Sequence, residues 1–224
     1  MLDALQAEAS VCRRCRLHST RTQVVFGVGN PHAELMFVGE APGFHEDKQG
    51  YPFVGQAGQL LDQLLSGIGM TRADVYVANT LKCRPPGNRD PQPDEIEACE
   101  PYLFRQIELI EPTMIATLGN FATKLLSGKP TGITRAHGVE QRVTLGGREV
   151  LLYPLYHPAA ALYTPSLRTV LEQDFARIPA LLARGAATPA APLVRAAQPA
   201  RDPVAAVPVL AAAAAPEPVQ LGLF

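Results

Sequence analysis

The sequence lacks any apolar run long enough to cross a membrane, and its N-terminus lacks the apolar core of a secretion signal. These absences exclude a membrane protein and predict a cytoplasmic one. An excess of charge is also lacking, because 20 lysines and arginines stand against 21 aspartates and glutamates, for a net charge of −1. No strong overall field therefore draws the chain to nucleic acid. Any contact with DNA must come from local basic clusters, whose candidates are Arg13, Arg14, Arg16, Arg21, Lys82, Arg84, Arg89 and Arg168.

Cysteine is scarce as well, with four residues in the chain. In a reducing compartment, four cysteines argue against two disulfides and for a metal site or buried thiols. Cys12 and Cys15 form a C-x2-C pair that can bring two thiolates to one metal through a tight loop. Cys83 and Cys99 are spaced more widely, so the segment between them must fold back. From spacing alone, zinc, an iron–sulfur cluster and free thiols all stay open.

The bulk of the chain points to one folded domain with a C-terminal extension. Its 224 residues suffice for one well-buried domain, with some chain left over. From Gly185 the composition changes to alanine, proline and valine with few charges, which is typical of a disordered linker. We therefore predict a domain over residues 1–184, a linker over 185–219 and a separate terminal peptide over 220–224. No internal repeat is found, and we expect a monomer.

Four apolar segments have the length and bounded ends of buried strands, at residues 35–38, 74–81, 113–118 and 149–155. Helical patterns predict helices over residues 2–10, 60–68, 93–110, 121–126 and 166–184, the last with Ser166 as a candidate N-cap. Residues 22–30 are predicted to be extended, and residues 128–147 to hold turns and a hairpin. Alternating strands and helices predict an α/β fold, a three-layer αβα sandwich around a mostly parallel sheet of four strands.

The chain is organised around residues 39–58, which read GEAPGFHEDKQGYPFVGQAG. A buried strand leads into this stretch and a leucine-rich helix follows it, so the stretch lies at the carboxyl edge of the sheet. Glycine lets the backbone approach a ligand closely, and proline fixes the turns. Asn79 and the segment that starts at His157 also come at or after strand ends, so three polar segments are expected to form one pocket.

Residues 39–58 resemble the first active-site motif of the family 4 uracil-DNA glycosylases. HPAAAL at 157–162 is similar to the second motif of that family, and KCRPPGNRDP at 82–91 is similar to its cysteine-containing run. The resemblance spans residues 12 to about 180. It implies an enzyme that flips uracil out of DNA, hydrolyses the N-glycosidic bond and so starts base excision repair. It also implies a structural [4Fe–4S] cluster on Cys12, Cys15, Cys83 and Cys99.

The resemblance also assigns roles in the substrate site. Phe53 offers the flipped base a stacking face, and the Asn79 side chain has the donor and acceptor that match O4 and N3–H of uracil. Glu46 corresponds to a family carboxylate that excludes thymine, and His157 donates to the charge that develops on O2. The full set of predicted substrate-binding residues is Gly39, Ala41, Gly43, Glu46, Phe53, Asn79 and His157.

No single residue matches a water-orienting base. Other uracil-DNA glycosylase families carry an aspartate where this chain has Ala41, so Glu40 and Asp47 are the carboxylates suggested for that role. Hydrolysis of an N-glycosidic bond moves no electrons. The cluster is therefore expected to pin the N-terminal segment and the loop at 84–98, both basic, near DNA phosphates.

Two further segments are expected to contact partners. LYTPSLR at 162–168 resembles the loop that fills the gap left by a flipped base, with Leu162 or Tyr163 as the wedge and Arg168 on a phosphate. The chain ends in QLGLF, which resembles the short peptide by which bacterial replication and repair proteins bind the sliding clamp; a frayed tail is the alternative. The predicted clamp-binding residues are Gln220, Leu221, Leu223 and Phe224.

Two other functions stay open. One is a non-catalytic or covalently trapping protein of the same superfamily that binds uracil or damaged DNA. A trapping branch of that superfamily carries GEQPG and an extra basic loop, whereas this chain has GEAPG and no such insertion, which favours the enzyme. The other is a nucleotide-binding protein whose cysteines hold a structural zinc ion.

Overall fold

The computed structural model describes residues 1–186. The last described helix, α9 (Ile178–Ala186), runs past residue 184, at which the folded domain was predicted to end. The rest of the predicted linker and the clamp-binding residues at 220–224 lie outside the described residues, so their boundaries and role stay predictions.

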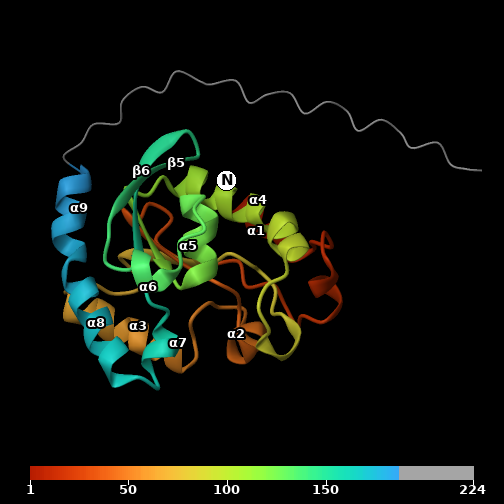
Figure 1. Ribbon diagram of the computed structural model, residues 1–224. Helices are drawn as coiled ribbons and strands as arrows, with labels where there is room; N and C mark the ends of the chain where they lie inside the picture. The colour runs from red at the N-terminus through yellow and green to blue at the C-terminus, as the bar shows by residue number, and fades with distance from the viewer. Residues whose placement is uncertain (187–224) are drawn as a thin grey trace, which may run out of the picture. The chain divides into compact units, whose positions relative to one another are not determined.

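A six-stranded sheet forms the centre of the fold, in the order β1-β3-β2-β4-β6-β5. Figure 1 shows the β6–β5 edge of this sheet. The four predicted strands are confirmed, and they run parallel to one another. They are β2 (Leu35–Gly39), β3 (Val75–Asn79), β4 (Met114–Leu118) and β6 (Arg148–Leu155). The predicted number of four is wrong, because β1 (Val28–Gly29) and β5 (Gln141–Leu145) add an antiparallel strand at each edge.

The two edge strands carry weak sequence signals. β1 has only two residues, and both are exposed to solvent. β5 has a single buried residue, Leu145, so it lacks the run of apolar residues by which a buried strand is recognised in a sequence. It joins β6 through Gly146 and Gly147, whose φ angles of 57° and 76° suit a tight two-residue hairpin turn.

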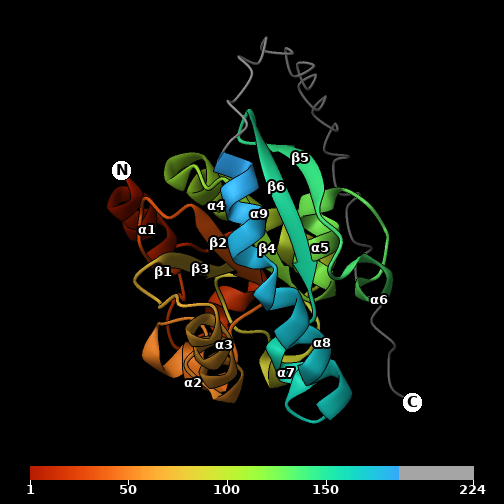
Figure 2. The same cartoon turned by 90° about the vertical axis from the view of Figure 1, so that its left-hand side faces the viewer.

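Helices cover both faces of the sheet, which confirms the three-layer sandwich. One face packs against α3 (Gln56–Gly67), α8 (Pro165–Ala176) and α9, which lie in front of the sheet in Figure 2. The other face packs against α4 (Pro93–Ile110) and α5 (Asn120–Ser127). Successive side chains of β2 point to opposite faces of the sheet. Phe37 belongs to the apolar cluster with α3, α8 and α9, and Val38 to the cluster with α4 and α5.

The single helix predicted over residues 166–184 is wrong, because the structure has α8 and α9 with a break at Arg177. Pro179 has no N–H to donate to the carbonyl group of Phe175, so the helical ladder cannot continue there. Ser166 is not the N-cap either. Thr164 holds that position, and Pro165, with its fixed φ, opens the first turn.

Short helices complete the described fold. They are α1 (Leu2–Ser10), α2 (Phe44–Gln49), α6 (Ile133–Ala136) and α7 (Pro158–Ala161), with 3-10 turns η1 (Arg16–Ser19) and η2 (Pro86–Asn88). α1 packs against α4. No helix within residues 1–186 combines the length and the apolar character that a membrane span requires.

Candidate active site

A pocket of about 330 Å³ lies where β2, β3 and β6 end. α2, α3 and α7, which begin next to the loops around it, gather at one end of the sheet in Figure 2. The pocket brings together most of the predicted site residues. Its lining includes Glu40, Ala41, Gly43, Glu46, Phe53, Asn79 and His157.

Asn79 ends β3, and its side chain is the most unusual polar group of the pocket. The residue is only 2% exposed, and its Oδ1 atom is buried without a hydrogen-bond partner among residues 1–186. Gly39 makes this position possible, since a Cβ atom there would lie 2.4 Å from Asn79 Oδ1 and 2.7 Å from the Phe53 ring. An unpaired buried acceptor is costly, so the pocket is built to receive a donor.

Phe53 forms one wall of the pocket in a strained conformation, with a φ angle of 56°. Its carbonyl oxygen accepts a hydrogen bond from Arg72 Nη2 at 2.9 Å. Gly58 allows the turn, because a Cβ atom there would lie 1.7 Å from the same carbonyl oxygen. Sequence reasoning missed Arg72. It precedes β3 outside every motif, and it acts through a backbone atom that no side-chain pattern reveals.

His157 lies opposite, with its ring centroid 5.6 Å from that of Phe53. Its Nδ1 atom accepts a hydrogen bond from the Ala159 N–H at 3.1 Å, so the neutral ring carries its proton on Nε2. Burial lowers the pKa of His157 to about 4, against a smaller opposing effect of the Glu46 carboxylate. The pocket thus holds a neutral imidazole whose Nε2–H is available to a ligand.

Three acidic residues near the pocket differ in their surroundings. Glu46 Oε1 accepts from the N–H groups of Val54 and Gly55, both at 3.0 Å, and so fastens α2 to the turn before α3. Burial, together with the charge of Asp90, raises the pKa of Glu40. Asp47 is not brought to the pocket. It is buried elsewhere, and its Oδ1 accepts from the Thr22 N–H at 2.9 Å.

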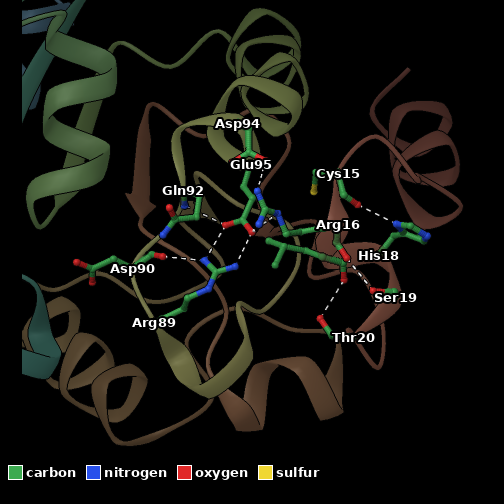
Figure 3. A network of polar contacts seen from close by, with 11 residues as sticks. Cys15, Arg16, His18, Ser19, Thr20, Arg89, Asp90, Gln92, Asp94 and Glu95 are labelled. Atoms are coloured by element: carbon green, nitrogen blue, oxygen red, sulfur yellow. Dashed lines mark hydrogen bonds and ion pairs between the residues drawn. The ribbon is translucent and has the colours of Figure 1, made fainter.

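The remaining wall comes from the loop before α4, through Pro85, Asn88 and Arg89. Arg89 is held by the fully buried Glu95, with contacts of 2.9 and 2.6 Å (Figure 3). Arg16 approaches the same carboxylate at 3.7 Å and pairs with Asp94 at 2.7 Å. One buried carboxylate therefore joins a pocket wall to the N-terminal segment that carries Cys15.

The four cysteines line a second, smaller cavity, and none of them forms a disulfide. Arg21 Nη1 donates to Cys83 Sγ at 3.3 Å, and the backbone N–H of Lys82 donates to Cys99 Sγ at 3.2 Å. Burial raises the pKa of Cys99 to about 11. Within the described part of the chain, no three His, Cys, Asp or Glu side chains are close enough to hold one metal ion.

The predicted DNA-contacting residues lie around the turn between α7 and α8. Tyr163 is 82% exposed and Leu162 is partly exposed. Arg168 lies in α8, where its guanidinium contacts Glu172 Oε1 at 3.0 Å and Gln63 Oε1 at 3.2 Å.

Together, the fold and the pocket define an α/β protein whose site, at the carboxyl end of its sheet, has a buried unpaired acceptor beside an aromatic ring. The family profile described as "Uracil DNA glycosylase superfamily" matches residues 26–178. The chain is 50% identical over 181 residues to the "Type-4 uracil-DNA glycosylase" of Archaeoglobus fulgidus, covering 79% of this chain and 91% of that protein. It is 49% identical to the protein of that name from Sulfurisphaera tokodaii (79% and 83% covered) and 43% identical to that of Thermotoga maritima (78% and 91% covered). The chain therefore belongs to the uracil-DNA glycosylase superfamily and, within it, to the type-4 family.

Proposed function

We propose that this protein is a monofunctional uracil-DNA glycosylase, which releases uracil from DNA and so starts base excision repair. The observation that carries the proposal is the unpaired Oδ1 of Asn79, buried beside the Phe53 ring. An acceptor there pairs with N3–H of uracil, and the amide NH₂ of the same side chain donates to O4. Cytosine has an acceptor at N3 and a donor at its amino group, so the same amide mismatches it.

The neighbouring side chains suit the rest of the base. The Phe53 ring offers a stacking face of fixed orientation, since Arg72 and Gly58 determine the backbone conformation. Glu46 has its carboxylate fixed by two backbone N–H groups, and we assign it the exclusion of the thymine methyl group. Ala41 and Gly43 line the pocket, and Gly39 leaves the space that Asn79 Oδ1 and the Phe53 ring occupy, so we assign these three small residues to close contact around the base.

The chemistry follows from His157 and Glu40. Cleavage of the bond between N1 and C1′ leaves the electron pair on uracil, and the Nε2–H of neutral His157 stabilises the charge on O2. A water molecule adds its oxygen to C1′ and loses a proton. Glu40 is the pocket carboxylate suited to accept that proton, because burial raises its pKa above that of a solvated glutamate. Asp47, bonded to Thr22, has no part in this scheme.

The cysteine cavity fits a [4Fe–4S] cluster on Cys12, Cys15, Cys83 and Cys99. All four cysteine side chains line one cavity, and donors from Arg21 and Lys82 reach two of the sulfur atoms, as sulfur ligands that carry negative charge would require. In such a cluster each thiolate binds its own iron, so the thiols need not meet at one ion. When bound, the cluster supplies a covalent link between the N-terminal segment and α4, and the hydrolysis uses none of its electrons.

We assign DNA contacts to the turn after α7, with the exposed Tyr163 or Leu162 as the wedge. Arg168 reaches a phosphate only by giving up Glu172 or Gln63. The terminal residues Gln220, Leu221, Leu223 and Phe224 keep the role of a peptide for a bacterial sliding clamp. Accordingly, a chain that stops after Ala186 should retain its activity on short oligonucleotides and lose binding to the clamp.

The test is to incubate the purified protein with an end-labelled oligonucleotide that contains one uracil, followed by alkali. Alkaline cleavage at the uracil position, with free uracil in solution, supports the enzyme. A protein–DNA adduct that survives detergent supports the covalently trapping alternative. An intact strand with neither product contradicts the proposal.

A further inference from the structure

Phe44, an exposed aromatic residue beside the pocket, takes no part in the proposed binding or cleavage of uracil. Phe44 is the first residue of α2 and directly follows Gly43, which lines the pocket. It is 50% exposed, and its ring meets that of His45 edge to face, with centroids 5.5 Å apart. The ring lies one residue from the pocket lining, so its exposed face is open to a ligand that extends beyond the pocket.

Two cations lie against this ring. Arg84 has its guanidinium carbon 5.2 Å from the ring centroid of Phe44, and Lys48 has its Nζ atom 6.0 Å away. Arg84 is also fixed at the pocket, since its Nε donates to Asn88 Oδ1 at 2.6 Å and Asn88 lines the pocket wall. Phe44 and Arg84 therefore lie next to two residues of the pocket lining, Gly43 and Asn88, without lining the pocket themselves.

These charges are not neutralised by the protein. Within residues 1–186, no carboxylate forms an ion pair with Arg84 or Lys48. The other basic residues nearby are already engaged: Arg89 is paired with Glu95, and Lys82 is buried against Asn79. An exposed ring with unpaired cations matches a nucleotide, whose base stacks and whose phosphate is anionic.

We propose that Phe44, Arg84 and Lys48 bind the nucleotide adjacent to the extruded uracil in an unpaired strand. The base stacks on Phe44, and the phosphate contacts the two cations. In a duplex the neighbouring base stays stacked and paired, so it cannot reach the ring. The site therefore favours single-stranded DNA, and it rests on the proposed function, in which the uracil occupies the adjoining pocket.

The test compares binding of a uracil-free single strand with binding of the matching duplex, by fluorescence anisotropy. Phe44→Ala should weaken binding of the single strand about tenfold, the size of one lost base–aromatic stack, and change duplex binding less than about twofold. Phe44→Trp should restore the affinity. Tyr51→Ala is the matched control, because Tyr51 is an exposed aromatic that follows α2 and, within residues 1–186, no cation lies over its ring; it should change neither affinity.

A second measurement reports stacking directly. An oligonucleotide with 2-aminopurine next to a uracil should lose fluorescence on binding the wild-type protein and keep it with Phe44→Ala. Equal single-strand affinities and equal quenching for the two proteins overturn the site. Excision of uracil is scored in parallel with both proteins. A wild-type protein that binds single strands through Phe44 but excises nothing would sink the proposed enzyme and leave the site standing.

Discussion

The pocket at the end of the sheet and the cysteine cavity differ in whether their polar atoms have hydrogen-bond partners. The pocket at the end of β2 and β3 has a volume of about 330 Å³ and keeps one buried acceptor, Asn79 Oδ1, without a partner. The cysteine cavity is small, lies in an apolar cluster, and has donors already directed at two of its sulfur atoms. The first arrangement suits a ligand that enters and leaves, and the second suits a group that stays.

The two regions are nevertheless joined. Lys82 donates its backbone N–H to Cys99 Sγ and its Nζ to the carbonyl oxygen of Asn79 at 2.8 Å. Gln106 fixes the same ammonium group at 2.6 Å, and burial lowers the pKa of Lys82 to about 8. A buried cation thus couples the backbone of Asn79 to the cysteine region. Four changes test where the two regions act separately and where they act together.

The largest effect is expected from the cysteines. Cys99→Ala should remove most of the soluble, folded protein together with its iron, because ligation and folding are linked. Ala98 lines the same cavity but is not proposed to bind iron, so Ala98→Ser is the matched control. The measurements are the iron and sulfide content and the melting temperature of both variants, compared with those of the wild-type protein. An iron-free Cys99→Ala protein with an unchanged melting temperature is incompatible with a structural cluster.

His157→Ala should lower the single-turnover excision rate by roughly 10²–10³, the usual loss for one charge-stabilising donor. Iron content should stay unchanged and the protein should still fold, because apart from the pocket the change removes only the hydrogen bond to the Ala159 N–H at the start of α7. His32→Ala is a suitable control, since His32 is exposed and outside the pocket. A wild-type rate in the His157 variant would remove the donor role.

Lys82→Met tests the link between the regions. It keeps a long apolar side chain but leaves the Asn79 carbonyl and Gln106 Oε1 unpaired, at a cost of about 1–3 kcal/mol in the free energy of unfolding. We expect slower excision with iron content retained. Denaturant titration and single-turnover kinetics measure the two quantities. Normal kinetics in a destabilised variant would show that Lys82 supports the fold without positioning Asn79.

The smallest effect concerns pH. With a pKa of about 4, His157 is neutral throughout about pH 5–8, whereas an ordinary histidine would change charge there. The ratio of wild-type to His157→Ala rates should therefore stay constant across that range. In the unfolded chain the ring titrates near its usual value of 6.5, so its contribution to stability is full above about pH 6.5 and is lost as pH falls toward 4. A tenfold change of the rate ratio near pH 6.5 argues against the lowered pKa.

The parallel core was predictable because buried strands leave apolar runs with clear ends, as in β2 and β4. The edge strands left a weaker signal. Residues 22–30, predicted to be extended, contain β1, and residues 128–147, predicted to hold a hairpin, contain β5, but neither segment has the apolar run that marks a strand of the central sheet. The break between α8 and α9 follows from Pro179, and a proline at this position of a predicted helix already indicates such a break in the sequence.

The site shows a similar division. Motif residues such as Asn79 and His157 line one pocket because they sit at or after the ends of parallel strands. Asp47 does not join them. It neighbours Glu46 on α2, and adjacent helical residues point in different directions. Arg72 was invisible to sequence reasoning, because its contact is with the Phe53 carbonyl and depends on tertiary structure alone.

The central claim is that Asn79 Oδ1 reads N3–H of uracil. It is tested most directly by single-turnover excision of uracil and of N3-methyluracil from otherwise identical oligonucleotides. The methylated base lacks the donor and leaves the buried oxygen unpaired, so we predict excision slower by about 10⁴ or more. Equal rates for the two bases would contradict the assignment of Asn79 and, with it, the account of how this pocket selects uracil.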